Sequence, residues 1–419
     1  MTSVIGVEVD CPFTPSMLRK VSHAGCQSAS FVQATKDLMA LAEVNVSRER
    51  VQRWVGRVGE ERIAQTRAEA NAYQQLPLPA RGLSPQDRAH VQVPQVACVQ
   101  MDGGRIQIRD RENTSADENS KGRDSKGHWR ETLVGCLLSM TSQEHAEDPC
   151  PKIPATFIDP QRMSDLGREI KGFASEPVEP NDSQDTAEER ASQKRLGQPQ
   201  LLVRSVIATR QGVDAFGKQM VAAAYARGFH AARRKAFVAD GSATNWGVHR
   251  KHFSHYTPIL DFTHAICYVY AAAMAGRAAE EGWREYCQWA QWLWAGQTTE
   301  LIAAVAHRSR QLGLASKDES ETSPRNIIAK TLVYLKNQRS RMNYAKYRQL
   351  GLPITSSHIE STIKQINRRV KGSEKFWSEG AEPILHLTAD HLSETTDFDR
   401  FWKKRRTQLK TTRHYQTAA

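Results

Sequence analysis

The sequence predicts an α/β protein with a mixed sheet, preceded by a helical region and interrupted by a long helical insertion. Three observations favour this fold class. Helical periodicity dominates the first 75 residues, short apolar runs recur between residues 96 and 262, and nearly all of the chain from residue 263 onward is helical in pattern. The chain has 419 residues, 39% of them hydrophobic, which is enough for a sizeable core and for two to three domains.

Residues 1–75 are expected to form a helical region that contains a helix pair over 31–65. Ser47 can cap the second helix, whose outward face carries Arg50, Arg53 and Arg57. A helix, a tight turn and an arginine-rich helix are the pattern of a helix-turn-helix DNA-binding unit. An ordinary helical hairpin with a solvated basic face is the alternative. The two apolar stripes are Phe31, Leu38, Leu41 and Ala42, and Val51, Trp54, Val55 and Val58.

The central region, residues 96–262, is expected to form a sheet. The first three expected strands suit antiparallel pairing, a helix over 214–228 follows them, and a further helix separates the last two strands. This order of elements is that of an RNase H-like α/β sheet. The segments expected to be strands are 96–109, 129–140, 201–209, 235–240 and 256–262.

The segments around these strands are expected to be loops and a linker. Residues 76–95 are rich in proline and predict a linker, and the charged residues 110–128 predict an exposed hairpin tip. Residues 141–200 predict a flexible loop. Its part from 174 to 199 is rich in Glu, Asp, Ser, Gln and Pro, which indicates a mobile surface segment.

The C-terminal half is expected to be helical. Residues 263–350 predict a helical insertion, and residues 351–419 predict an amphipathic helix followed by a basic helical tail. The tail sequence FWKKRRTQLK suits either a phosphate-binding patch or a solvated surface. Four tryptophans of the insertion are interpreted as core residues rather than base-stacking residues: Trp283, Trp289, Trp292 and Trp294.

Three carboxylates are candidate catalytic and metal-binding residues. Asp102 and Asp240 each end an apolar run and precede glycine. A carboxylate at the end of a buried strand must be paired or bind a cation, although Asp-Gly is also a common turn. Glu360 lies beside an apolar helical stripe with basic residues behind it, and a surface glutamate is its alternative reading. Together the three acids suit phosphodiester chemistry with two cations, Mg²⁺ or Mn²⁺, about 4 Å apart.

Three separated segments carry a resemblance to a known family. They are VQMDGG, FVADGSATNW with ILDFTHA, and IESTIKQINRRVKGSEKFWSEGAEPILHL. In this order they resemble the DDE transposases of bacterial insertion sequences, most closely the Kra-type family, with Mutator-like and hAT-like elements more distant. The resemblance covers residues from about 90 to 405. Asp261 and His264 match the signature that follows the family's second aspartate.

The resemblance implies a metal-dependent DNA transposase. Asp102, Asp240 and Glu360 would be its catalytic and metal-binding triad, with no nucleotide cofactor. The implied partners are double-stranded DNA, at transposon ends and target, and a second copy of the chain in a dimer on DNA. Two alternatives stay open, a catalytically inactive DNA-binding derivative and an RNase H-like nuclease without strand transfer. The expected DNA contacts are Arg50, Arg53, Arg57, Lys364, Arg368, Arg369 and Lys371.

The composition agrees with a nucleic-acid partner and argues against several other kinds of protein. The formal net charge is +12, which favours a polyanionic partner. Seven scattered cysteines, without a Cys-x-x-Cys pair, argue against a zinc ribbon and a disulfide framework. The pattern fits a reducing cytoplasm, and the resemblance implies association with the nucleoid of a bacterium. No signal peptide or membrane span is expected. His249, His252 and His255 at helical spacing would not converge on a metal, so metal binding there is not expected.

Overall fold

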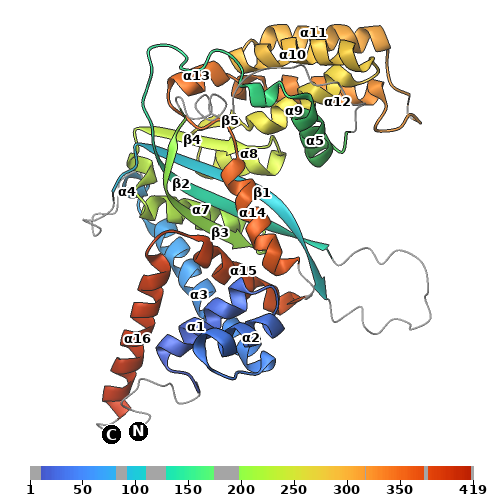
Figure 1. The fold of residues 1–419 in the computed structure, drawn as a ribbon. Coiled ribbons are helices and arrows are strands. Elements are labelled where there is room, and N and C mark those ends of the chain that lie inside the picture. The colour runs from blue at the N-terminus through green and yellow to red at the C-terminus, as the bar shows by residue number, and fades with distance from the viewer. Residues whose placement is uncertain are drawn as a thin grey trace, which may run out of the picture.

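The computed structural model describes residues 11–81, 92–109, 129–173, 198–316, 318–371 and 376–416. Within this part of the chain it shows the predicted α/β architecture, a mixed sheet between layers of helices (Figure 1). The strands follow the path β3-β2-β1-β4-β5, with β6 paired to the far end of β1. Their bounds are β1 Val96–Arg109, β2 Trp129–Thr141, β3 Gln200–Thr209, β4 Arg234–Ala239, β5 Thr257–Leu260 and β6 Phe376–Trp377.

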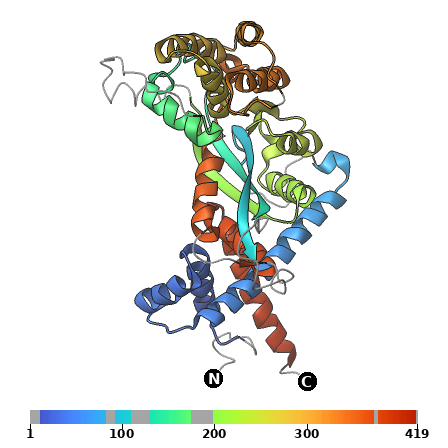
Figure 2. The same ribbon diagram turned by 90° about the vertical axis from the view of Figure 1, so that its right-hand side faces the viewer.

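The pairing of the strands follows the predicted order. β1, β2 and β3 are antiparallel neighbours, whereas β1, β4 and β5 run parallel to one another. The inner strands lack an alternating pattern because helices cover both of their faces. Figure 2 shows α14 (Ser357–Val370) on one face and α7 (Val213–Ala226) with α8 (Ala243–His252) on the other.

The N-terminal region is a group of three packed helices, one more than the predicted pair. α1 (Pro15–Gln27) packs on both α2 (Phe31–Ala42) and α3 (Arg48–Gln75), and a short α4 (Leu78–Arg81) follows. The predicted cap is confirmed, because Ser47 Oγ accepts a hydrogen bond from the Arg50 backbone N–H. The placement of Leu41 in the apolar stripe was wrong, since 87% of it is exposed.

α3 is longer than predicted because its second half packs against other helices. It packs against α7 and against α15 (Ser378–Leu392), which itself packs on β3. Arg62 of α3 makes a bidentate ion pair with Asp390 of α15. The helix therefore joins the N-terminal helices to the sheet layer.

The prediction of a flexible loop over 141–200 was wrong for its first part. Residues 155–157 form a 3-10 turn, and α5 (Pro160–Lys171) packs on α9 (Phe262–Met274), with Gly167 against the Tyr270 ring. Asp159 and Pro160 begin this helix as a cap and a first-turn proline. The expected hairpin tip at 110–128, residues 174–197 of the segment expected to be mobile (174–199) and residues 82–91 of the expected linker lie outside the described residues.

The helical insertion contains α9 and four further α-helices. Trp289 and Trp294 are buried and Trp283 and Trp292 are partly buried, as the core interpretation predicted. No helix in the described part of the chain is both long and apolar enough to span a membrane. The further helices are α10 (Ala279–Ala295), α11 (Thr298–Leu312), α12 (Pro324–Gln338) and α13 (Tyr344–Gln349), and the C-terminal helix is α16 (Asp397–Gln416).

Candidate active site

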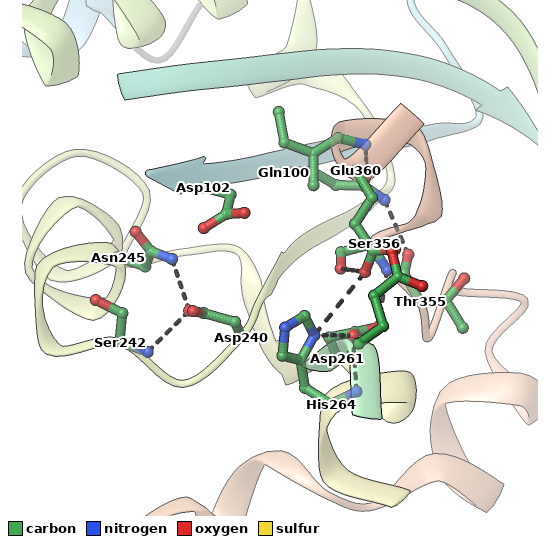
Figure 3. A network of polar contacts seen from close by, with 12 residues as sticks. Gln100, Asp102, Asp240, Ser242, Asn245, Asp261, His264, Thr355, Ser356 and Glu360 are labelled. Carbon is green, nitrogen blue, oxygen red and sulfur yellow. Dashed lines mark hydrogen bonds and ion pairs between the residues drawn. The ribbon is translucent and has the colours of Figure 1, made fainter. Parts of the chain in front are cut away.

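Three aspartates lie in one row across the parallel part of the sheet. Gln100 of β1 is paired with Val238 of β4, so Asp102 is level with Asp240, two residues further along. Ala239 of β4 is paired with Leu260 of β5, so Asp240 is in turn level with Asp261. The row thus lies at the carboxyl ends of β4 and β5 and beside the middle of the longer β1, where Figure 3 shows the side chains.

The Asp240 loop is held from several sides. Its carboxylate oxygen Oδ1 accepts hydrogen bonds from the Ser242 backbone N–H at 2.9 Å and from Asn245 Nδ2 at 2.8 Å. From α12, Tyr334 Oη donates to the Asp240 carbonyl at 2.8 Å. Gly241 has a φ of +100°, and a Cβ on it would lie 2.8 Å from the Tyr334 ring, so both conformation and space require glycine.

Asp261 and His264 form an ion pair beside this row. Asp261 has no exposed surface, caps α9 through the His264 backbone N–H, and lies 2.6 Å from His264 Nδ1. Burial by itself would lower the pKa of His264, but the hydrogen bond and charge of Asp261 outweigh it, with help from Asp240 and Glu360, and raise the pKa to about 9. The imidazole is therefore a cation among carboxylates at neutral pH.

Glu360 reaches the same site from the first turn of α14. Its Oε1 lies 3.9 Å from His264 Nδ1 and accepts a hydrogen bond from Ser356 Oγ at 3.4 Å. Burial first, and then the charge of Asp261, raise the pKa of Glu360. Burial and then the charge of Asp240, with Glu360 also contributing, raise the pKa of Asp102 to about 6.

The structure thus places Asp102, Asp240 and Glu360 around one site, but within the described residues the group whose ligand atoms come together is a different set. The ligand atoms of Asp261, His264 and Glu360 lie within 4.8 Å of one another. Two carboxylates and an imidazole at this spacing could hold a metal ion. Both oxygens of Asp261 already accept backbone hydrogen bonds, from Ser356 and from His264, so we interpret the Asp261–His264 part of this group as an internal ion pair.

Most of the arginines and lysines predicted to contact DNA are exposed. Arg50, Arg53 and Arg57 are exposed along the first half of α3. On α14 and directly after it, Lys364, Arg368 and Lys371 are also exposed, and Lys364 makes an ion pair with Glu169 of α5 at 3.0 Å. A groove of about 490 Å³ runs along α14 from Glu360 past Lys364 and Arg368 to Gln27 of α1.

The prediction for Arg369 was wrong. Only 2% of it is exposed, its Nε donates to the Gly25 carbonyl at 2.9 Å, and its guanidinium lies 4.5 Å from the centre of the Phe31 ring. A phosphate contact requires an accessible cation. Arg369 instead joins α14 to the N-terminal helices.

The three histidines at helical spacing have separate surroundings. His249 Nε2 contacts the Tyr256 carbonyl at 2.9 Å, and the ring of His252 lies against Gly217 of α7. His255 Nε2 lies 3.3 Å from Nδ1 of His230. Each ring therefore has a different neighbour.

Sequence reasoning missed several polar residues that hold the site. Gln100, Asn245, Tyr334 and Ser356 contact its acids or the elements that carry them. One signal was visible for Gln100, because it is the single polar residue in the apolar run VACVQM. The others are contributed by helices whose approach to the sheet no local pattern reveals.

Comparison of the chain with known protein families and with curated proteins finds no match.

Proposed function

We propose that the chain is a DDE-type DNA transposase with an RNase H-like core, which cleaves phosphodiester bonds at transposon ends and transfers the strands into target DNA. The observation that carries the proposal is the meeting of Asp102, Asp240 and Glu360, from two strands and a distant helix, at one edge of a mixed sheet. The strand order β3-β2-β1-β4-β5 supports the RNase H-like assignment. The exposed basic residues of α3 and α14 support a DNA partner.

The acids fit divalent cations such as Mg²⁺ or Mn²⁺. Carboxylate oxygens are the ligands these ions prefer, and the pKa of Asp102 is raised by burial first and then by the neighbouring charge of Asp240. Asp102, Asp240 and Glu360 would hold two such ions. When bound, the ions would activate the attacking water or 3′-hydroxyl and stabilise the leaving oxygen.

The chain's own residues prepare this site for a phosphate. Asn245 and the Ser242 N–H both bind Oδ1 of Asp240 and so orient its carboxylate. His264, charged through its pair with Asp261, places a cation beside Glu360, where it can attract a phosphate. Lys364 and Arg368 lie along the groove that leads from Glu360 and would bind the phosphates of the same strand.

The test is a paired measurement on Asp102→Asn. The substitution keeps the size of the side chain and removes one negative charge, so Mg²⁺- or Mn²⁺-dependent cleavage of a DNA carrying the element's ends is expected to be abolished. DNA affinity, which depends on lysines and arginines, is expected to change little in a gel-shift assay. Full cleavage by the variant, or wild-type cleavage that survives EDTA, would contradict the proposal.

Strand joining to a second DNA separates a transposase from a nuclease without strand transfer. Cleavage with no joined product would favour the nuclease, and sequence-specific binding with neither reaction would favour a DNA-binding derivative. A dimer on DNA belongs to the same proposal, and light scattering of the protein–DNA complex would measure it.

A further inference from the structure

Gln100 connects the central strand to the helix that carries Glu360. It lies on β1 two residues before Asp102, has no exposed surface, and points to the same face of the sheet as Asp102. Its Nε2 donates to the Thr355 carbonyl at 2.9 Å, and its Oε1 accepts the Ile359 backbone N–H at 3.1 Å (Figure 3). Both contacts are with the start of α14, directly before Glu360.

The start of α14 depends on such contacts because it has no cap of its own. Ser356 is in the cap position but makes no side-chain capping hydrogen bond. The Ile359 N–H is shared between the Ser356 carbonyl at 3.0 Å and Gln100, and the Ser356 N–H is bound by Asp261 Oδ1 at 2.9 Å. Side chains from β1 and from the end of β5 therefore replace the usual cap and join the helix to the sheet.

This connection joins two elements that each carry a candidate metal ligand. Asp102 lies on β1, and Glu360 lies in the first turn of α14. Two hydrogen bonds from a buried side chain on β1 itself join the backbone of α14 to the strand that carries Asp102.

We propose that Gln100 is a positioning residue of the active site. Through Thr355 and Ile359 it fixes the first turn of α14, so that Glu360 faces Asp102 before any metal or DNA is bound. The inference rests on the proposed function, because the fixed position of Glu360 relative to Asp102 would serve to bind cations. Residues that hold ligand-bearing elements in this way typically change metal affinity or activity by about 10- to 100-fold when they are replaced.

The test compares Gln100→Met with a matched control. Methionine keeps the length of the side chain and removes both hydrogen bonds. Gln219→Leu is the control, because Gln219 is also a buried glutamine but lies on α7, across the sheet from α14. Calorimetric titration of DNA-free protein with Mn²⁺ is expected to show affinity about 10- to 100-fold weaker in Gln100→Met and unchanged in Gln219→Leu. Wild-type Mn²⁺ affinity in a folded Gln100→Met would overturn the proposal.

A second measurement reports on the helix without any metal. Amide hydrogen exchange over residues 355–360 is expected to be faster in Gln100→Met than in the wild type. If that variant does not fold, Gln100→Glu replaces it, because glutamate keeps an acceptor for Ile359, while its ionised form loses the donor to Thr355 and adds a negative charge. Faster exchange in the same segment is expected there too, and wild-type exchange rates would overturn the proposal.

Asp102→Asn in the same titration separates failure of this inference from failure of the proposed function. Equal Mn²⁺ affinity in Asp102→Asn and the wild type would reject the metal site, and with it the proposed function. Weaker affinity in Asp102→Asn together with wild-type affinity in Gln100→Met would reject the positioning role alone.

Discussion

His264 Nδ1 lies 2.6 Å from Oδ2 of Asp261, a carboxylate without exposed surface that also accepts the backbone N–H groups of His264 and Ser356. One buried charge thus pairs with a cation, begins α9 and holds the start of α14. Removing Asp261 takes away the main partner of His264 and leaves the backbone N–H groups of His264 and Ser356 without their acceptor.

Asp261→Ala is therefore expected to lower the free energy of unfolding by about 3–5 kcal/mol. Urea unfolding in metal-free buffer at pH 7 measures this. The control is Asp214→Ala, which removes an exposed carboxylate that pairs with Lys218 and Lys251 and is expected to change stability far less. Equal decreases in the two variants would show that the Asp261 network does not stabilise the fold.

The basic face of α3 leads to a prediction about salt dependence. Replacing Arg50, Arg53 and Arg57 together by glutamine is expected to weaken DNA binding. The slope of log affinity against log salt concentration is expected to become shallower by about 0.9 for each phosphate that is no longer neutralised. Fluorescence anisotropy at several salt concentrations gives the slope. The control replaces the exposed residues Arg284, Arg310 and Lys330 of the insertion by glutamine, which removes the same three positive charges. The same slope in both variants would show that α3 has no particular role.

Two adjacent arginines of α14 are expected to behave in opposite ways. Arg369 is buried against Gly25 and Phe31, so Arg369→Met is expected to lower the free energy of unfolding by about 2–3 kcal/mol. Arg368 is exposed in the groove, so Arg368→Met is expected to keep stability and to weaken DNA binding. Denaturant unfolding and salt-dependent binding of both variants check this, and a reversed pattern would contradict the structure.

The contact between His230 and His255 predicts sensitivity to acid. Burial, followed by His255 and Lys235, lowers the pKa of His230 from 6.5 to about 4. In the unfolded chain this histidine binds a proton near pH 6.5, whereas in the folded chain it does so only near pH 4. The stability that comes from keeping His230 neutral is therefore complete above pH 6.5 and decreases progressively as the pH falls below it. The groups around the ring are His255, Lys235 and the tyrosines Tyr73, Tyr225 and Tyr256.

His230→Gln is expected to reduce the fall in Tm between pH 7.5 and pH 5. Thermal unfolding of the wild type and the variant across this range measures the effect. His307→Gln, at an exposed position on α11, is the control and is expected to keep the fall seen in the wild type. A fall in His230→Gln as large as that in the wild type would show that another group causes the acid sensitivity.

Local pattern was sufficient to predict most of the sheet. The five strands β1 to β5 and the helix α7 lie within a few residues of their predicted bounds, because each is a short apolar run or a periodic segment that can be recognised without its partners. The Ser47 cap was predictable for the same reason, since a cap acts on residues two or three positions away. α5 was missed because a short polar helix with few buried residues has a composition close to that of a loop.

The sequence by itself determined which acids end apolar runs, and so it singled out Asp102 and Asp240. Only the tertiary structure decided that these two are level with Asp261, because register depends on the pairing of strands that can lie more than a hundred residues apart. Likewise, Arg369 has the same local pattern as exposed Arg368, yet it is buried against a carbonyl 344 positions away. Charge and periodicity are local properties, whereas burial and alignment arise when distant segments pack, and the candidate site is made by that packing.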